Sequence, residues 1–274
     1  MRKVLVPVLL LSFLFFTCKK DPEIVRISNL SGGQIGVFGH GGMGIKSLLP
    51  INSKESLLAA LKLGADGTEM DVQMSADSVL FLFHAAELSE NTQCAGRIGE
   101  MPSKEIDCHY KSLKSGSLKV ITVRDFLEAL SDTICILTFE LKTYDLTQKQ
   151  FPVMARAISK LLREFNLLER SFVESTSPEL LLELRQALPQ LRLFYYSEQI
   201  DTALVIADNC DFFGVTFDLN RVTAEQVEEA HQRNLRVTLF NQQTKSDNLR
   251  TLPLNPDFIQ TDELRHMLEV SGKK

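Results

Sequence analysis

The sequence predicts a (β/α)8 TIM barrel of the α/β class, with a β-hairpin and a loop insertion after the second strand. Eight strand-like segments alternate with helical patterns along most of the chain, and most links between them are short. Alternation of this kind favours parallel strands joined by right-handed crossovers. A doubly wound open sheet is the alternative, but no Gly-x-Gly-x-x-Gly motif follows the first strand.

The strand candidates are short apolar runs bounded by turn-forming residues. They cover residues 35–39, 67–72, 134–141, 172–175, 191–196, 212–217, 235–240 and 257–260. A further run at 79–83 follows the second strand after four mostly polar residues, 75–78. Because a parallel crossover needs a dozen residues or more, this run is expected to pair antiparallel with the second strand.

The predicted hairpin gathers ionisable side chains on one face. With the turn centred in the middle of the four-residue link, Glu69 lies opposite His84 and Asp71 lies opposite Leu82. Residues two apart on a strand share a face, so Glu69, Asp71 and His84 converge. The same alternation of carboxylates with apolar neighbours is also typical of a strand with one solvated face.

Capping residues mark the starts of the predicted helices. They are Ser53 ahead of a helix closed by Gly64, the Thr122–Asp125 capping box, the pair Ser177-Pro178, and the Thr223–Gln226 capping box. A longer amphipathic helix is expected over 147–168, with Pro152 in its first turn. The segment 85–121 contains no clear crossover helix, so it is either an insertion over the active-site mouth or a crossover with a weak pattern.

The composition fits one globular domain, which the strand pattern places at residues 35–270. Of the 274 residues, 44% are hydrophobic and 24% are charged, which is ordinary for a globular protein. The net charge is −5 and no basic aromatic cluster offsets it, so the sequence argues against a nucleic-acid partner. The pattern does not define an oligomeric state.

The N-terminus has the features of an export signal. Arg2 and Lys3 precede an apolar run at 4–16, which is too short to span a bilayer comfortably but suits a signal peptide. Cys18 directly after this run resembles the lipidation site of a bacterial lipoprotein, although Thr17 is larger than the usual residue before it. We therefore expect a signal peptide at 1–17, a lipid anchor at Cys18 and a tether at 18–34. A plain secretory signal or an uncleaved anchor is the alternative.

An anchor at Cys18 places the protein outside the cytoplasm, in the periplasm or on the cell surface, where disulfides form. Cys94 and Cys108 both lie in the polar segment 85–121 and are candidates for a bridge. Cys135 and Cys210 lie in or beside apolar strand patterns and are expected to pack as small hydrophobic residues.

Several strand ends carry ionisable residues, and in a barrel the carboxyl ends of the strands form the active-site mouth. His40 follows the first strand, Glu69 and Asp71 end the second, and Glu140 and Lys142 end the strand at 134–141. Each residue also has a structural interpretation, because charges past strand ends are commonly just solvated. Asp262 is interpreted as a favourable charge at a helix N-terminus.

The order of these residues resembles the glycerophosphodiester phosphodiesterase family over roughly residues 35–268. The resemblance rests on Phe38-Gly39-His40, Asn52-Ser53, Gly64-Ala65-Asp66-Gly67-Thr68-Glu69-Met70-Asp71-Val72, His84, Phe139-Glu140-Leu141-Lys142 and Ile259-Gln260-Thr261-Asp262. It implies a barrel with one Ca²⁺ or Mg²⁺ ion held by Glu69, Asp71 and Glu140. It further implies His40 and His84 as the acid/base pair and Lys142 near the phosphate.

The implied reaction is hydrolysis of a glycerophosphodiester to glycerol 3-phosphate and an alcohol. A cation offsets the negative charge of the diester, and carboxylates are suitable ligands for Ca²⁺ or Mg²⁺, whereas no Cys/His cluster has zinc spacing. We assign His40 as the base that deprotonates the nucleophile, either water or the neighbouring glycerol hydroxyl, and His84 as the acid that protonates the departing alcohol. The sequence does not fix which histidine has which role. Lysophospholipids or envelope phosphodiesters are alternative substrates, and a lipoprotein that binds a phosphorylated ligand without hydrolysing it is the alternative outside enzymes.

The chain departs from the family pattern at four positions. Gly41 replaces an arginine that contacts phosphate, Ile51 replaces a glutamate, Ala85 replaces an aspartate after the second histidine, and Thr238 stands where a tryptophan is common. The loss at position 41 removes a bidentate phosphate donor. These departures predict an unusual substrate preference. Asn52 is interpreted first as a cap of the first helix and second as a site residue.

Overall fold

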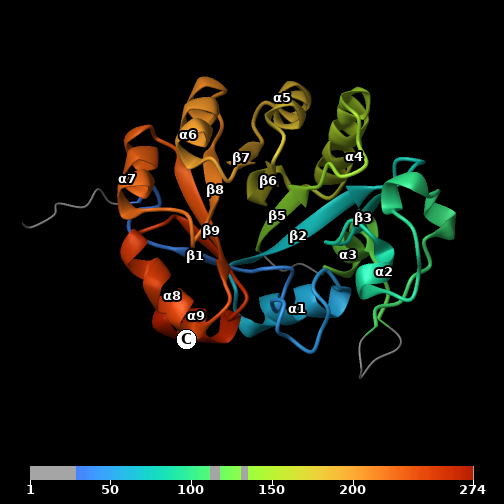
Figure 1. Ribbon diagram of the computed structural model, residues 1–274, viewed down its shortest axis with the longest axis horizontal. Coiled ribbons are helices and arrows are strands. Elements are labelled where there is room, and N and C mark those ends of the chain that lie inside the picture. Colours follow the sequence, from blue (N-terminus) through green and yellow to red (C-terminus); the bar gives the residue numbers. More distant parts are fainter. Residues whose placement is uncertain (1–28, 112–117, 131–134, 274) are drawn as a thin grey trace, which may run out of the picture.

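The structure is a computed structural model that describes residues 29–111, 118–130 and 135–273. Its centre is a closed barrel of parallel strands, with helices between them on the outside (Figure 1). The strands are β1 (Gly36–Gly39), β2 (Gly67–Met74), β5 (Ile136–Leu141), β6 (Ser171–Ser175), β7 (Arg192–Tyr196), β8 (Gly214–Asp218), β9 (Arg236–Gln242) and β10 (Phe258–Thr261). Because β1 pairs with both β2 and β10, the sheet has no open edge there, and the predicted (β/α)8 barrel is confirmed.

Helices of two to four turns follow the strands. They are α1 (Lys54–Leu63), α3 (Val123–Ala129), α4 (Phe151–Glu164), α5 (Pro178–Ala187), α6 (Ile200–Asn209), α7 (Ala224–Gln232), α8 (Lys245–Thr251) and α9 (Leu264–Val270). The predicted caps are present, and Gly64 closes α1 in the left-handed conformation with φ 104°. The helix predicted over 147–168 is shorter, because 3-10 turns at Gln148–Gln150 and Leu168–Arg170 replace its two ends.

Two helices had no place in the sequence-based prediction. The N-cap of α6 is Gln199, which makes no side-chain capping hydrogen bond, so the start of this helix carries no sequence signal. In contrast, α8 starts with a capping box of Thr244 and Asp247, a signal that was present in the sequence but was not used.

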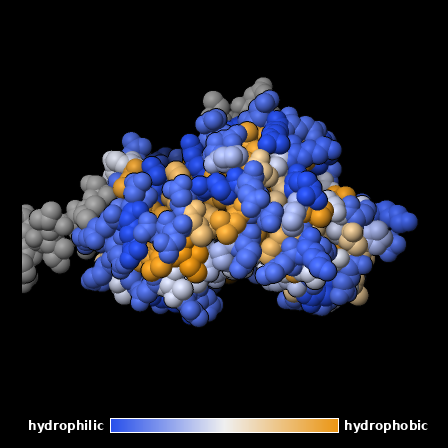
Figure 2. Space-filling view, turned by 90° about the horizontal axis from the view of Figure 1, so that it is seen from above, coloured by the Kyte–Doolittle hydropathy of each residue, from blue (hydrophilic) through white to orange (hydrophobic). Residues whose placement is uncertain are grey.

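Apolar side chains fill both the space between strands and helices and the inside of the barrel. Phe38, Phe172, Phe194 and Phe258 come from β1, β6, β7 and β10 and contact one another across the interior, with ring centroids as close as 4.8 Å. This aromatic floor closes the barrel below the carboxyl ends of the strands. The outer face seen in Figure 2 is mostly hydrophilic, with apolar side chains in separate patches.

The hairpin partner of β2 is β3 (Leu80–Leu82), which pairs antiparallel as predicted. The predicted register is wrong by one residue, because Leu82 lies opposite Val72, and the amide of Phe83 donates to the carbonyl of Asp71 at 3.0 Å. The cause is the turn. The amide of Ser75 donates to the carbonyl of Val79, so three residues rather than four form the link. Within this turn, Ser78 adopts the left-handed conformation with φ 69°.

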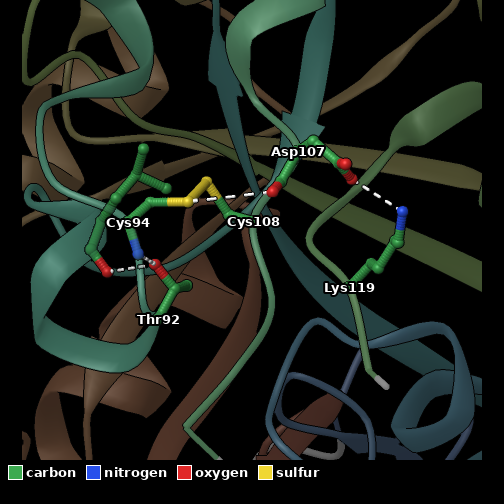
Figure 3. The surroundings of a disulfide bond; sticks show 6 residues. Thr92, Cys94, Asp107, Cys108 and Lys119 are labelled. Carbon is green, nitrogen blue, oxygen red and sulfur yellow. Dashed lines mark hydrogen bonds and ion pairs between the residues drawn. A yellow bond between two sulfur atoms is a disulfide. The ribbon is translucent and has the colours of Figure 1, made fainter. Parts of the chain in front are cut away.

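The segment after the hairpin is an insertion, not a missed crossover, because α3 supplies the crossover to β5. It contains α2 (Leu88–Asn91), two 3-10 turns (Ile98–Glu100 and Ser103–Glu105) and β4 (Ile121–Thr122), which pairs with β3. Its buried residues form a hydrophobic cluster separate from the main core. The predicted Cys94–Cys108 disulfide is present (Figure 3), while Cys135 is buried and Cys210 half-buried as free thiols.

The first described residues are held against the amino-terminal ends of the strands. The side chain of Asn29 donates to the carbonyls of Gln34 and Pro256, both at 2.9 Å, and Ser31 donates to Asp257 at 3.0 Å. The predicted signal peptide, Cys18 and the first part of the predicted tether lie outside the described residues. Among the helices that are described, none combines the length and apolarity that a membrane crossing requires.

Candidate active site

A cavity of about 120 Å³ opens at the carboxyl ends of the barrel strands. Four predicted site residues line it together: His40, His84, Glu140 and Lys142. The floor of the barrel is apolar, so the polar groups are concentrated at this end. Strand ends that are far apart in the sequence therefore deliver their side chains to one space, as the barrel geometry requires.

Three carboxylates form a cluster at this cavity. One oxygen from each of Glu69, Glu140 and Glu174 lies within 4.8 Å of the others. Glu69 is buried, and its Oε1 atom has no hydrogen-bond partner in the described part of the chain. Burial, reinforced by the nearby Asp71 charge, raises the pKa of Glu69 well above its ordinary value. A buried carboxylate oxygen without a donor, in a set of hard oxygen ligands, fits a divalent cation such as Ca²⁺ or Mg²⁺.

Asp71 lies beside this cluster and is paired with a cation. The Lys142 ammonium nitrogen lies 2.8 Å from an Asp71 oxygen and 2.6 Å from a Glu140 oxygen. Burial alone would raise the pKa of Asp71, but the Lys142 charge outweighs it and holds the pKa well below its usual range. Asp71 is therefore ionised, and the Lys142 ammonium lies between two of the predicted metal ligands.

Asn52 belongs to the site rather than to the helix cap. Its side-chain amide donates to Asp71 at 2.6 Å, and its side-chain oxygen accepts the Asp71 amide at 2.9 Å. Ser53 is the residue that caps α1. The first sequence interpretation of Asn52 was therefore wrong, and the second is the one that the geometry favours. A φ of 63° at Asn52 turns the chain so that this side chain can reach β2.

His40 is oriented by Asp262, which the sequence had indicated only as a favourable charge at a helix N-terminus. Its Nδ1 lies 2.9 Å from Asp262, whose carboxylate also accepts the amide of Ile45. Burial lowers the pKa of His40, but the hydrogen bond and charge of Asp262, with the charge of Glu69, outweigh this and raise it to about 10. Asp262 therefore does more than favour a helix N-terminus. It fixes the ring so that Nε2 is the nitrogen left for chemistry.

Glu174 is the other site residue that was missed. It is the last residue but one of β6, is buried, and accepts hydrogen bonds from Thr216 at 2.5 Å and Gln260 at 2.8 Å. Burial and the charge of Glu140 raise the pKa of Glu174 to about 7. A lone glutamate within an otherwise strand-like run was the available signal, since a carboxylate is rarely buried without a role.

His84 reaches the cavity although the hairpin register differs from the predicted one. It follows the end of β3, is exposed, and lines the same cavity as His40. Its neighbour Ala85 is buried, and the Ala85 carbonyl accepts from Gln73 at 2.8 Å. At position 41, the glycine amide donates to Glu69 at 2.9 Å. Backbone at Gly41 thus stabilises a carboxylate of the site.

The fold and site are those of a TIM-barrel enzyme with its acidic centre at the carboxyl ends of the strands. The model of the glycerophosphoryl diester phosphodiesterase family matches residues 43–266. The chain belongs to this family and is thus an enzyme of the phosphodiesterase class.

Individual relatives are similar over most of their length. A glycerophosphodiester phosphodiesterase of Caldanaerobacter subterraneus is 21% identical over 230 residues, which cover 82% of this chain and 93% of the relative. An Oleispira antarctica phosphodiesterase, solved in complex with the product sn-glycerol-3-phosphate, matches with a TM-score of 0.79 at 19% identity, over 88% of this chain and 98% of that chain. A Parabacteroides distasonis glycerophosphodiester phosphodiesterase matches with a TM-score of 0.77 at 20% identity, covering 90% and 98%.

Proposed function

We propose that this protein hydrolyses glycerophosphodiesters to glycerol 3-phosphate and an alcohol with the help of one Ca²⁺ or Mg²⁺ ion. The observation that carries the proposal is the shared cavity, which is lined by two histidines and by members of a carboxylate cluster. One buried oxygen of this cluster has no hydrogen-bond partner among the described residues. Family membership supports the substrate class. The product complex of the Oleispira relative supports the same reaction by analogy.

The cation would be held by Glu69, Asp71 and Glu140, with Glu174 as a further carboxylate at the same place. A bound divalent ion would neutralise charge on the phosphodiester and so favour attack on phosphorus. Lys142 would bind a phosphate oxygen, and the position of its ammonium at the cavity, beside Asp71 and Glu140, supports this role. Asn52 holds Asp71 in place from below.

The two histidines would handle the protons. With Nδ1 bonded to Asp262, Nε2 of His40 is the nitrogen that would take a proton from the attacking water. Acting as the base requires a neutral ring, and a bound cation would favour that form by offsetting the charges of Glu69 and Asp71 that help to raise the pKa of His40. His84 would give a proton to the departing alcohol oxygen, which is otherwise a poor leaving group. Replacing either histidine with alanine is expected to lower turnover by about 10²–10⁴-fold, the usual range for acid/base catalysis.

The test is the release of glycerol 3-phosphate from a panel of glycerophosphodiesters, with and without EDTA. Wild type should release glycerol 3-phosphate only when the cation is present. Glu69→Gln should release none even when the cation is present. Glu225→Gln, on the exposed face of α7, is the matched control and should behave as wild type. If no member of a panel that includes lysophospholipids and larger envelope diesters is hydrolysed, the binding-protein alternative replaces this proposal.

From the sequence, we further infer that the protein is exported and anchored through lipid on Cys18. The apolar run at 4–16 followed by Cys18 supports this inference. Membrane fractionation of Cys18→Ala tests it, since the variant should leave the membrane fraction. Retention of that variant on membranes would contradict a lipid anchor at this residue.

A further inference from the structure

A second cavity, of about 390 Å³, lies next to the catalytic one. His84 lines both cavities, so the two meet at the residue that we assign to the departing alcohol. One wall is the loop between β1 and α1, and the other is formed by α2 and the end of the insertion. The volume lies in the range of small-molecule sites.

The walls of this second cavity are mainly apolar. Ile45, Leu49, Pro50 and Ile51 line it from the loop, and Phe83 lines it from the end of the hairpin. Leu49 also packs against the hydrophobic cluster of the insertion, which supports this wall. Apolar walls favour the apolar part of a ligand, because burying it removes its surface from water.

The charged residues of the second cavity offset each other. They are Glu90 and Lys111, one of each sign, and the Lys111 ammonium already donates to the carbonyl of Ser89 at 2.6 Å. Glu90 accepts the amide of Glu87 in the capping box of α2. The cavity therefore offers no excess negative charge to a cationic alcohol such as choline or ethanolamine.

Tyr110 adds an aromatic side chain to the wall of the second cavity. Its ring is stabilised by Phe83, with ring centroids 6.1 Å apart. The Tyr110 hydroxyl is buried and has no hydrogen-bond partner in the described residues, so it offers no accessible donor to a ligand in the cavity. Tyr110 therefore adds to the wall without adding a charge.

We propose that the second cavity holds the alcohol that leaves the phosphodiester, and that this alcohol is uncharged and chiefly apolar. This inference rests on the proposed function. In the reaction, a bond forms between the water oxygen and phosphorus while the bond from phosphorus to the alcohol oxygen breaks. His40 takes the proton from water, and His84 donates a proton to the alcohol oxygen, so the products are glycerol 3-phosphate and the neutral alcohol.

The test compares two substrates of nearly identical shape. One is glycerophosphocholine, and the other is the ester in which 3,3-dimethylbutanol, the uncharged isostere of choline, replaces choline. Wild type should hydrolyse the neutral ester with a kcat/KM roughly tenfold higher. Ile45→Glu adds a carboxylate to the wall at a residue that is 45% exposed, so the fold should tolerate it, and it should reverse the preference.

The matched control is Leu48→Glu. It makes the same change on the same loop at a residue that is 73% exposed and does not line the cavity, so the wild-type preference should remain. If wild type prefers the choline ester, or if both variants shift the preference equally, the subsite inference is wrong while the proposed reaction stands.

A binding measurement separates this inference from the proposed reaction. Saturation-transfer NMR on 3,3-dimethylbutyl phosphate should show transfer to its methyl protons in wild type and Leu48→Glu, and several-fold less in Ile45→Glu. Phosphocholine should give the weaker signal with wild type. This pattern without any diester hydrolysis would support the subsite and refute the reaction, whereas no transfer to either ligand would refute the subsite.

Discussion

Gly41 and Ile51, which are two of the departures from the family pattern, are neighbours in space. A Cβ atom on residue 41 would lie 2.5 Å from the Cβ of Ile51. The left-handed conformation at Gly41, with φ 54°, also disfavours any side chain. In this loop conformation an arginine therefore has no room at position 41, because its Cβ would meet the Cβ of residue 51.

This contact gives a prediction for stability. Gly41→Ala should lower the free energy of unfolding by about 2 kcal/mol, part from backbone strain and part from the clash. Gly32→Ala is the control, since it shares a left-handed backbone at φ 69° but has no heavy atom within 4 Å of the added methyl group. Urea denaturation measures both.

A double-mutant cycle isolates the clash. Ile51→Gly, which removes the Cβ atom that the new methyl group would meet, should destabilise the wild-type protein but partly rescue Gly41→Ala, with a coupling energy of about 1 kcal/mol. Additive effects of the two substitutions would mean that the loop relaxes without cost.

The interaction of His40 with Asp262 predicts how protonation affects the cation-free protein. Because the folded pKa of His40 is raised from 6.5 to about 10, its contribution to stability is complete below pH 6.5 and is lost as the pH rises towards 10. NMR titration of the ring should show a pKa above 6.5, and Asp262→Asn should lower it. An unchanged pKa in that variant would rule out Asp262 as the cause.

At the residue scale, sequence patterns identified the groups that end strands but not all of their partners. Glu69, His84 and Glu140 could be predicted from the sequence, because strand ends converge in any barrel. The pairing of Asp262 with His40 joins the two ends of the chain, 222 positions apart, and no local pattern encodes such a contact. Glu174 was missed because a single carboxylate inside a strand has no periodic signal.

Among the elements, the insertion is a small unit with its own core and its own covalent link. The disulfide joins Cys94 and Cys108 at a sequence separation of 14, while Thr92 beside it accepts the amide of Cys94 (Figure 3). A loop of this length closed by a disulfide is stabilised by about 3 kcal/mol. Because its hydrophobic cluster is separate from the main core, the effect should remain local.

Replacing both Cys94 and Cys108 with alanine should therefore loosen the insertion and leave the barrel folded. Limited proteolysis should cut the variant faster between residues 85 and 121, with little change in the thermal unfolding of the rest. Replacing Cys135 with alanine is a control, since that thiol is free and lies in the main core. Equal cleavage rates in wild type and double variant would show that the bridge does not hold this segment.

The hairpin shows where prediction at the element scale fails. Its existence and direction followed from apolar runs and a short link, but its register depended on whether three or four residues form the turn. Ser78 decided this by adopting a positive φ, which serine rarely does. The alternation of strands and helices was easier to predict, because the spacing of apolar residues within each segment indicates its secondary structure.

For the whole molecule, the acidic centre predicts stabilisation by a cation. Carboxylates that repel one another across the barrel destabilise the folded state, and an ion that binds only that state shifts unfolding. Ca²⁺ or Mg²⁺ at about 100 times its dissociation constant should add about 2.7 kcal/mol to the free energy of unfolding. Thermal unfolding with cation and with EDTA measures this shift.

Glu140→Gln should remove most of that stabilisation, since it takes away one oxygen ligand and one charge. Glu179→Gln, on an exposed turn of α5, should keep it. A cation shift of equal size in both variants would place the binding site elsewhere.

The hydrogen bonds of Asn29 and Ser31 determine at which end of the barrel the described chain begins. These residues are fixed at the end where the strands begin, through Pro256 and Asp257, whereas the catalytic groups stand where the strands finish. The described chain therefore begins at the end of the barrel opposite the mouth. An anchor on the residues before Asn29 would join the barrel at that end, which would leave the mouth open to substrates dissolved in the surrounding fluid.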